Sequence, residues 1–202
     1  MPSYFHMMEN QITASPQPVL DFWFGTPDSP DYGSQRPEWF QKSPIFDDQA
    51  KDKLWGLYEQ ACAGELDAWA NDHKGMLALI ILLDQLSRNF HRDSPQAFAQ
   101  DAKALDLARR ALDAGFDQRL LVVQRCFIYM PFEHSEDLAD QDLCVDLFEG
   151  LRGELPDAFL DYADKHRVII RRFGRFPHRN AILGRESTPE EIEFLTQPGS
   201  SF

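Results

Sequence analysis

The sequence predicts an all-α protein of antiparallel helical hairpins stacked in a degenerate tetratricopeptide-like array. Apolar residues recur at spacings of three and four rather than two, short segments with Gly or Pro separate them, and no stretch alternates like a strand. Residues 104–117 have the small-residue rhythm of a tetratricopeptide second helix, although no 34-residue repeat is present. We expect one domain over residues 1–202, with residues 1–15 poorly ordered and 198–202 forming a tail.

The first predicted helices are marked by apolar stripes and by the residues that end them. A short aromatic helix is expected over residues 19–24, followed by a loop because residues 26–37 contain three prolines. A longer helix over residues 46–62 ends at Gly64. Residues 75–88 are apolar nearly all round, which indicates a helix buried among others.

Start and stop residues define the next two helices. Ser94 as N-cap and Pro95 at the first helical position predict a helix that ends at Gly115. Residues 120–130 form a second buried apolar helix, which we expect Pro131 to end because proline lacks the backbone N–H.

Three more helices complete the chain. Ser135 is a candidate N-cap for the first of them. The second is expected over residues 156–173, with Tyr162 and His166 on its apolar stripe. The last begins at a capping box formed by Thr188 and Glu191.

Composition limits the classes of function. The formal net charge of −13 disfavours general nucleic-acid binding. The longest apolar run, residues 76–83, is too short to span a bilayer, and the N-terminal residues have no pattern of a secretory signal. Three cysteines without a Cys-x-x-Cys pair fit a reducing compartment. We therefore expect a cytoplasmic protein that binds neither membrane nor nucleic acid, and no sequence motif indicates a cofactor.

The charge reverses locally in residues 166–185, which hold six arginines and no acidic residue. Arginine rather than lysine suits planar, bidentate partners such as carboxylate or phosphate. One interpretation is a set of ion pairs that attach the last helices to an acidic body, and a second is a pocket for a small anion. An acidic protein partner is a third. The candidate ligand-binding residues of this segment are Arg175, His178, Arg179 and Asn180.

The turn at residues 131–137 brings one imidazole among three carboxylates. A neighbouring carboxylate can orient a histidine for acid or base chemistry, so His134, held by Glu133 or Glu136, is the candidate catalytic group. In the alternative, Ser135 caps a helix and the acidic residues only stabilise the positive start of that helix.

Charged residues also lie on the two most apolar helices. Asp84 and Arg88 are four residues apart and can pair on one face, and Arg125 is in the middle of the second apolar helix. Because an isolated buried charge is costly, each must find a partner or a ligand. We expect either a buried polar network or a ligand site that includes Arg88, Asn89 and Arg125.

Metal chemistry is a third possibility. It would need His134 and Glu136 to meet His166 or His178, but a spacing of two residues is poor for ligands on one helix, and no metal motif is present. His166 lies on an apolar stripe and is expected to be a core residue. The chain also lacks a phosphate-binding loop, a dinucleotide fingerprint and a Gly-x-Ser-x-Gly elbow.

Four motifs carry a family resemblance: LDFWFG at residues 20–25, ALIILLDQLSRNFHRDSPQAFAQD at 78–101, YMPFEHSEDLADQ at 129–141 and FGRFPHRNAILGRESTPEE at 173–191. Together they resemble a bacterial family catalogued as domain of unknown function 924, over nearly the whole chain. The resemblance implies an all-helical, tetratricopeptide-like fold and no particular reaction.

The leading hypothesis is an Arg- and His-rich pocket for a small ligand that carries a phosphate or carboxylate, with His134 as acid or base. The alternative is a helical interaction module that binds a peptide segment, and a metal-assisted hydrolase is the third. The sequence leaves open whether the protein is an enzyme, which ligand it takes, and its oligomeric state.

Overall fold

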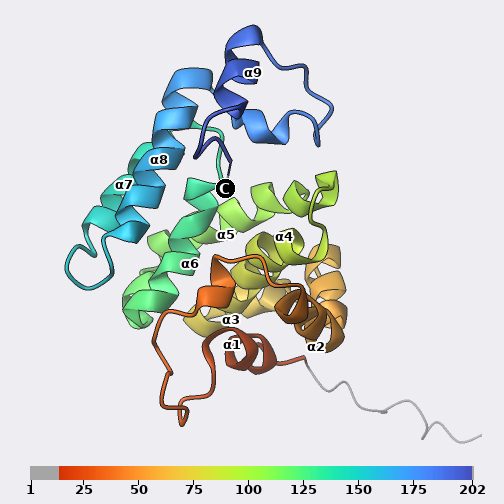
Figure 1. The fold of residues 1–202 in the computed structure, drawn as a ribbon. Coiled ribbons are helices and arrows are strands. Elements are labelled where there is room, and N and C mark those ends of the chain that lie inside the picture. Colours follow the sequence, from red (N-terminus) through yellow and green to blue (C-terminus); the bar gives the residue numbers. More distant parts are fainter. Residues whose placement is uncertain (1–13, 202) are drawn as a thin grey trace, which may run out of the picture.

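The computed structural model describes residues 14–201 and is all-α (Figure 1). In this part of the chain no strand occurs, and the only β contact is an isolated bridge between Arg152 and Leu155. The all-α prediction is confirmed, whereas the tetratricopeptide-like stacking and the single domain stay predictions. The predicted disorder of the N-terminal segment falls mostly on residues 1–13, which, like residue 202, lie outside the described residues.

The first helices follow the predicted stripes with shifted ends. They are α1 (Gln17–Phe24) and α2 (Pro44–Ala63). The predicted buried helix is one continuous helical stretch made of α3 (His73–Ile80), a π-helical turn η3 (Ile81–Leu86) and α4 (Ser87–Phe90). π-helical turns inside α-helices are frequently found at functional sites.

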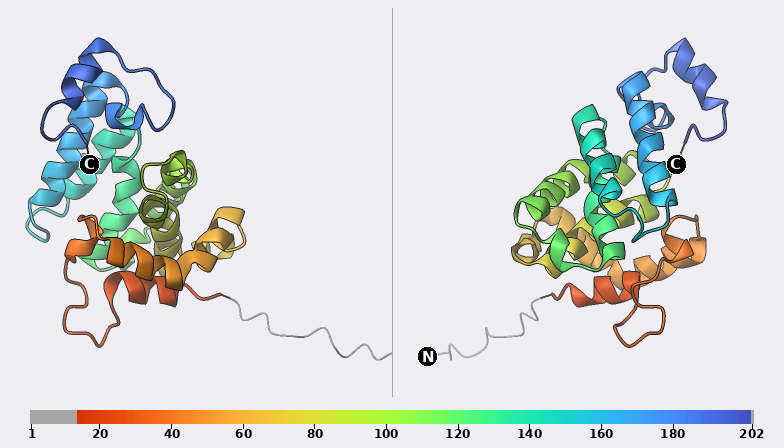
Figure 2. Two further views of the ribbon diagram at one scale, coloured as in Figure 1. Left: turned by 45° about the vertical axis from the view of Figure 1, so that its right-hand side comes forward. Right: turned by 90° about the vertical axis from the view of Figure 1, so that its left-hand side faces the viewer.

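The second half of the chain forms two helical pairs and a C-terminal helix. The bounds are α5 (Asp101–Asp113), α6 (Val122–Glu133), α7 (Leu138–Glu149), α8 (Ala158–Phe173) and α9 (Pro189–Leu195). Helices α7 and α8 pack side by side, and the views agree that α9 lies at the end of the molecule opposite α1 and α2 (Figures 1 and 2). No helix in the described part is long and apolar enough to cross a membrane.

Two apolar clusters fill the interior. The larger one extends from Val19 to Ala163 and includes a group of aromatic rings around Phe127. The smaller one, with Ile170 and Phe176, belongs to the C-terminal part of the chain. The C-terminal part therefore has an apolar cluster of its own, and the polar contacts described below connect it to the rest.

Two predicted helix signals act differently in the structure. Ser94 and Pro95 stand at the predicted N-cap and first position, but the element they begin is a 3₁₀ turn η4 (Pro95–Phe98) that precedes α5, and the Ser94 hydroxyl donates to the backbone oxygen of His91 instead of making a cap bond. Pro131 does not end α6, which continues to Glu133. The missing N–H of proline removes a single bond near the helix end, and the next turn is still closed by His134 N donating to Met130 O at 2.9 Å.

The predicted cap of α7 is wrong by two residues. The N-cap is Asp137, whose carboxylate accepts from the backbone N–H groups of Ala139 and Asp140. A carboxylate is the better acceptor at the positive end of a helix. Ser135 instead donates its hydroxyl proton to the Asp140 side chain at 2.7 Å.

The C-terminal helices agree with their sequence signals except at one residue. Thr188 and Glu191 form the predicted capping box at the start of α9. On α8, His166 is buried as expected, but Tyr162 is 52% exposed. The buried stripe of α8 is narrower than predicted because only one side of this helix packs on the body.

Candidate functional site

A cavity of about 390 Å³ lies between the start of α5, the end of α6 and the 3₁₀ turn η6 (Pro177–Arg179). Cavities of this size accommodate small ligands. The polar and charged residues that line the cavity are Asp101, His134, Ser135, Glu136 and Arg179. The two segments singled out in the sequence, the His134 turn and the arginine-rich segment, therefore meet at one cavity.

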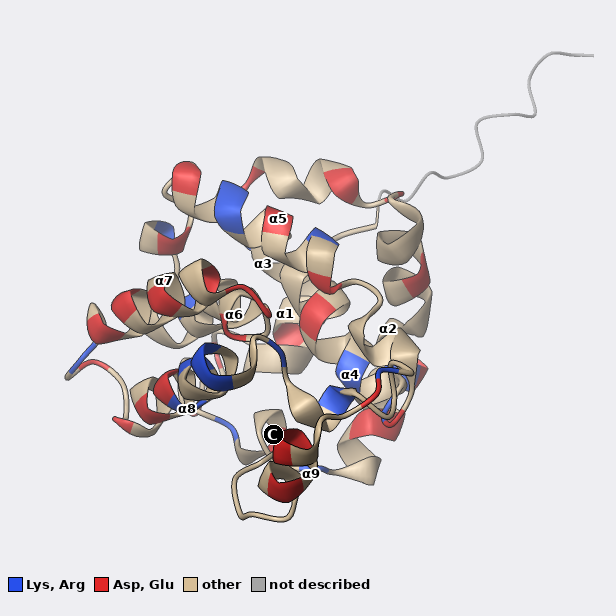
Figure 3. Cartoon of the chain, turned by 90° about the horizontal axis from the view of Figure 1, so that it is seen from above, with Lys and Arg blue, Asp and Glu red and all other residues tan. Residues whose placement is uncertain are grey.

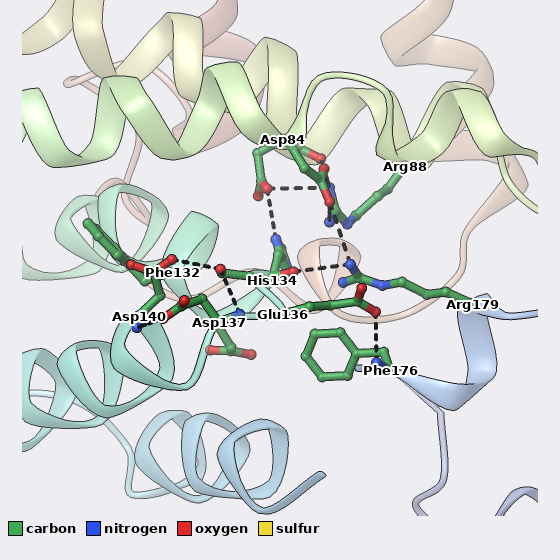
Figure 4. A network of polar contacts seen from close by, with 12 residues as sticks. Asp84, Arg88, Phe132, His134, Glu136, Asp137, Asp140, Phe176 and Arg179 are labelled. Carbon is green, nitrogen blue, oxygen red and sulfur yellow. Dashed lines mark hydrogen bonds and ion pairs between the residues drawn. The ribbon is translucent and has the colours of Figure 1, made fainter. Parts of the chain in front are cut away.

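His134 is oriented by Asp84 (Figure 4). The ring Nδ1 lies 2.8 Å from Oδ1 of Asp84, which the π-helical turn η3 carries. The predicted partners, Glu133 and Glu136, are not the residues that hold the ring, so this prediction is wrong. Both carboxylates lie within two residues of His134 in the sequence, but their side chains point to other partners.

The charges of this pair favour a neutral imidazole on an ionised carboxylate. Burial raises the pKa of Asp84, but His134 and Arg88 together lower it well below its usual range. Burial lowers the pKa of His134, and the positive charge of Arg88 lowers it further. At neutral pH the Nδ1–H group therefore donates to Asp84, and Nε2 is left as a proton acceptor.

His134 is one of the residues that line the cavity. Within the described part of the chain, Nε2 of His134 has no hydrogen-bond partner, and the side chain keeps 16% of its surface exposed. Asp84 behind it is 1% exposed. A ring held on one side by a buried carboxylate and open on the other is suited to general acid–base chemistry.

Arg88 extends this network to α5. Its guanidinium donates to both carboxylate oxygens of Asp101, at 2.9 and 3.0 Å, and lies 3.3 Å from Oδ1 of Asp84. The same group also donates to the backbone oxygen of Asp84 at 2.7 Å. Arg88 was a predicted ligand-binding residue, and its guanidinium has internal partners on both sides.

Arg179 enters the cavity from η6. Its Cζ lies 4.7 Å from the ring centroid of Phe98 and 4.4 Å from that of Phe176, so that a ring lies beside the guanidinium in each case. Nη1 donates to the backbone oxygen of His134 at 3.1 Å and lies 3.7 Å from Oδ2 of Asp101. The residue is 6% exposed, and burial lowers its pKa to about 10.

The other five arginines of residues 166–185 form ion pairs. The pairs are Arg167 with Asp164 and Asp142, Arg171 with Asp142, Arg172 with Glu190, Arg175 with Glu191, and Arg185 with Glu136. Figure 3 shows the basic end of α8 near the acidic start of α9, and acidic residues on most other helices. These contacts are the ones that the ion-pair interpretation of the segment expects.

Two predicted ligand-binding residues of the segment lie away from the cavity wall. Arg175 donates through Nε and Nη2 to the two oxygens of Glu191, at 2.6 and 2.8 Å. Asn180 is fully buried, accepts from Arg185 and donates to Ser187. Both side chains connect the C-terminal segment to itself.

Three further candidates also lie outside the cavity lining. Asn89 donates to Asp47 at 2.7 Å, and Arg125 donates to the backbone oxygen of Leu120 at 3.4 Å. The ring of His178 lies against Phe176, and burial lowers its pKa to about 4. Among the predicted residues, the structure therefore brings only His134, Glu136 and Arg179 to the cavity wall, with Arg88 behind them.

Glu136 and Glu133 have separate structural partners. Glu136 accepts from the backbone N–H of Phe176 at 2.7 Å and from both terminal nitrogens of Arg185, at 2.6 and 2.9 Å. Glu133 lies 3.2 Å from Nδ1 of His166 and is buried. Burial, followed by the charge of Asp84, raises the pKa of Glu133 to about 8.

The raised pKa of Glu133 predicts a measurable pH dependence of stability. Between about pH 4.5 and pH 8 the folded protein keeps a proton on Glu133 that the unfolded chain releases, so the free energy of unfolding falls as pH rises through this window. Glu133→Gln removes the titrating group. Urea unfolding is measured at pH 5, 6.5 and 8. The free energy of unfolding of the variant, relative to that of the wild type, should increase with pH by at most about 1.4 kcal/mol per pH unit. If the free energies of unfolding of the two proteins change equally with pH, the raised pKa of Glu133 is contradicted.

The residues of the metal hypothesis do not form a metal site. Among residues 14–201, no group of three or more His, Cys, Asp or Glu side chains is arranged to hold a metal ion. The rings of His134 and His166 are near each other, with centroids 6.4 Å apart, but Nδ1 of each ring faces a protein acceptor.

The described part of the chain is all-helical and places a buried Asp–His pair beside a small cavity. Residues 19–199 match a family described as bacterial protein of unknown function (DUF924), and the chain belongs to this family. The fold is similar to that of ATU0120 from Agrobacterium tumefaciens, a protein of unknown function, with a TM-score of 0.79 and 39% identity. The similarity covers 89% of this chain and 96% of that chain. No curated protein matches the chain.

Proposed function

We propose that the protein binds a small anionic ligand in the cavity and that His134 exchanges a proton with this ligand. The observation that carries the proposal is the hydrogen bond between Nδ1 of His134, a residue that lines the cavity, and the buried carboxylate of Asp84. Asp84 takes the orienting role that the sequence suggested for Glu133 or Glu136. Arg179 is the one arginine or lysine among the residues that line the cavity.

The proton transfer follows from the ionisation of the pair. The Nε2 atom of neutral His134 accepts a proton from the ligand, and the negative charge of Asp84 stabilises the imidazolium that forms. The proton then returns from Nε2 to the product or to solvent. This role requires no change in the charge of Asp84.

Thermal unfolding against a panel of small phosphates and carboxylates tests the proposal. A ligand at 100 times its Kd raises the free energy of unfolding by about 2.7 kcal/mol, which raises the melting temperature by roughly 5 to 10 °C for a chain of this length. Ala102→Trp should abolish the shift, because Ala102 lines the cavity at an exposed position of α5. Ala114→Trp, exposed at the other end of α5, should keep it.

A helical interaction module remains the alternative function. If no anion of the panel changes the melting temperature, or if Ala102→Trp responds like the wild type, the cavity is not the ligand site. The interaction module would then be the working hypothesis.

A further inference from the structure

We infer that Gln141 is a positioning residue for His134: its side-chain amide fixes the backbone on both sides of His134 and so holds the imidazole against Asp84. Gln141 lies on α7 and is not among the residues that line the cavity. The inference rests on the proposed function, because the exact position of the His134 ring matters only if this ring exchanges a proton.

The carbonyl groups at the end of α6 need donors from outside the helix. The last carbonyls of an α-helix have no N–H partner within it, and α6 ends at Glu133. Nε2 of Gln141 donates to the backbone oxygen of Glu133 at 2.6 Å and to that of Ser135 at 2.7 Å. The backbone oxygen of Phe132 lies 3.2 Å from the same nitrogen. One amide group therefore binds the chain immediately before and immediately after His134.

The carbonyl group between these two has a partner as well. Nη1 of Arg179 donates to the backbone oxygen of His134 at 3.1 Å (Figure 4). Three consecutive carbonyls, those of residues 133–135, are thus held by side chains of α7 and η6.

These bonds determine how the ring approaches Asp84. The direction of the backbone sets the direction of the His134 side chain, and Nδ1 of this ring lies 2.8 Å from Oδ1 of Asp84. A displacement of the turn by about 1 Å would take this contact beyond the length of a hydrogen bond. The amide of Gln141 therefore acts on the ring through the backbone.

Only a donor fits at this position of α7. Gln141 is fully buried, and its Nε2 faces three carbonyl oxygens, which accept hydrogen bonds and cannot donate them. Its own Oε1 is buried without a hydrogen-bond partner among the described residues. An unpaired buried oxygen lowers stability, a cost that an apolar side chain of the same length would avoid. The amide is therefore placed for its N–H groups.

Nitrogen-15 NMR of His134 in Gln141→Met tests the inference, with the ring assigned through His134→Gln. Methionine is close to glutamine in length and volume but has no donor. In the wild type we expect the shifts of the protonated Nδ1 and the unprotonated Nε2 to be far apart. In the variant the two shifts should move toward each other, because the released ring exchanges between its two neutral forms.

Gln124→Met is the matched control. Gln124 is also a buried glutamine, and it lies at the opposite end of α6 from His134. Its side chain accepts from the backbone N–H of Leu121 at 3.1 Å and lies 3.5 Å from the hydroxyl of Tyr32. This variant should also lose stability, while the two ring shifts of His134 keep their wild-type values. An equal movement of the shifts in both variants would overturn the specific role of Gln141.

A second variant keeps the test decisive if Gln141→Met does not fold. Gln141→Glu retains the shape of the side chain. Its protonated acid donates one hydrogen bond and its carboxylate donates none. Because burial raises the pKa of a carboxyl group, we expect wild-type ring shifts at pH 5 and shifts closer together at pH 8. Ring shifts equal to those of the wild type at both pH values would overturn the inference.

The possible results separate this inference from the proposed function. A wild-type His134 ring that is charged at pH 7, or protonated on Nε2, would overturn the proposed function and this inference with it. A wild-type ring that is neutral with its proton on Nδ1, and that keeps both shifts in Gln141→Met, would overturn the role of Gln141 alone.

Discussion

Replacing Asp84 by Ala is expected to lower the free energy of unfolding by about 3 to 5 kcal/mol. The carboxylate is fully buried, bonds His134 at 2.8 Å and lies 3.3 Å from the guanidinium of Arg88. It also accepts from the side chain of Gln85 at 2.7 Å. Its removal leaves a cation and two polar groups without this partner in a site from which they cannot reach water freely. Urea unfolding at pH 7, followed by circular dichroism, measures the loss.

Two variants make this prediction specific. Asp84→Asn keeps an oxygen that can accept from His134 and should lose less stability than Asp84→Ala. Asp106→Ala removes an exposed aspartate of α5 and should change the free energy of unfolding by no more than about 0.5 kcal/mol. A loss below about 1 kcal/mol for Asp84→Ala would show that the network around Asp84 does not stabilise the fold.

Replacing Gly75 by Ala is expected to cost about 3 kcal/mol for a steric reason. Gly75 is buried in the first turn of α3, where a Cβ atom would lie 2.1 Å from the backbone oxygen of Trp69. This oxygen belongs to the 3₁₀ turn η2 (Asp67–Asn71) and is not the end of a flexible side chain. The backbone of η2 or α3 must therefore shift to accommodate one methyl group.

Gly56 provides the matched control for this substitution. It lies on the exposed side of α2, and a Cβ atom there would meet nothing within 4 Å. Gly56→Ala should stabilise the protein by about 0.5 to 1 kcal/mol, since alanine has the higher helix propensity. Urea unfolding of both variants tests the pair: equal effects of the two substitutions would contradict the packing of η2 against α3.

Much of the fold could be predicted because helix patterns are local. The apolar residues 75–88 predict a buried helix, and Thr188 with Glu191 predicts the start of α9. In each case the residues that form the signal lie close together in the sequence. The π-helical turn η3 leaves no such signal, because a helix that is apolar all round looks the same whichever backbone bond closes its turns. The predicted end at Pro131 failed because proline near a helix terminus removes only one hydrogen bond.

The candidate site was predicted in its parts but not in its connections. The cost of burying Asp84 indicates that it needs a partner, yet the partner is His134, 50 residues away. Glu133 and Glu136, within two residues of His134, were the more obvious choices in sequence, and only tertiary packing turns them toward His166 and Arg185. Nothing in the sequence distinguishes Arg179 from the paired arginines around it, because Phe98 and Phe176 come together only in the fold.

The protonation state of the His134 ring tests its proposed role as proton acceptor most directly. Nitrogen-15 NMR of the uniformly labelled protein reports which ring nitrogen of a histidine carries the proton. We expect His134 at pH 7 to be neutral with the proton on Nδ1, and to stay neutral below the usual histidine pKa, because burial lowers its pKa while Asp84 holds the Nδ1–H group. Assignment follows from the loss of the signal in His134→Gln. An imidazolium at pH 7, or a neutral ring protonated on Nε2, would contradict the proposal that Nε2 accepts a proton from a ligand in the cavity.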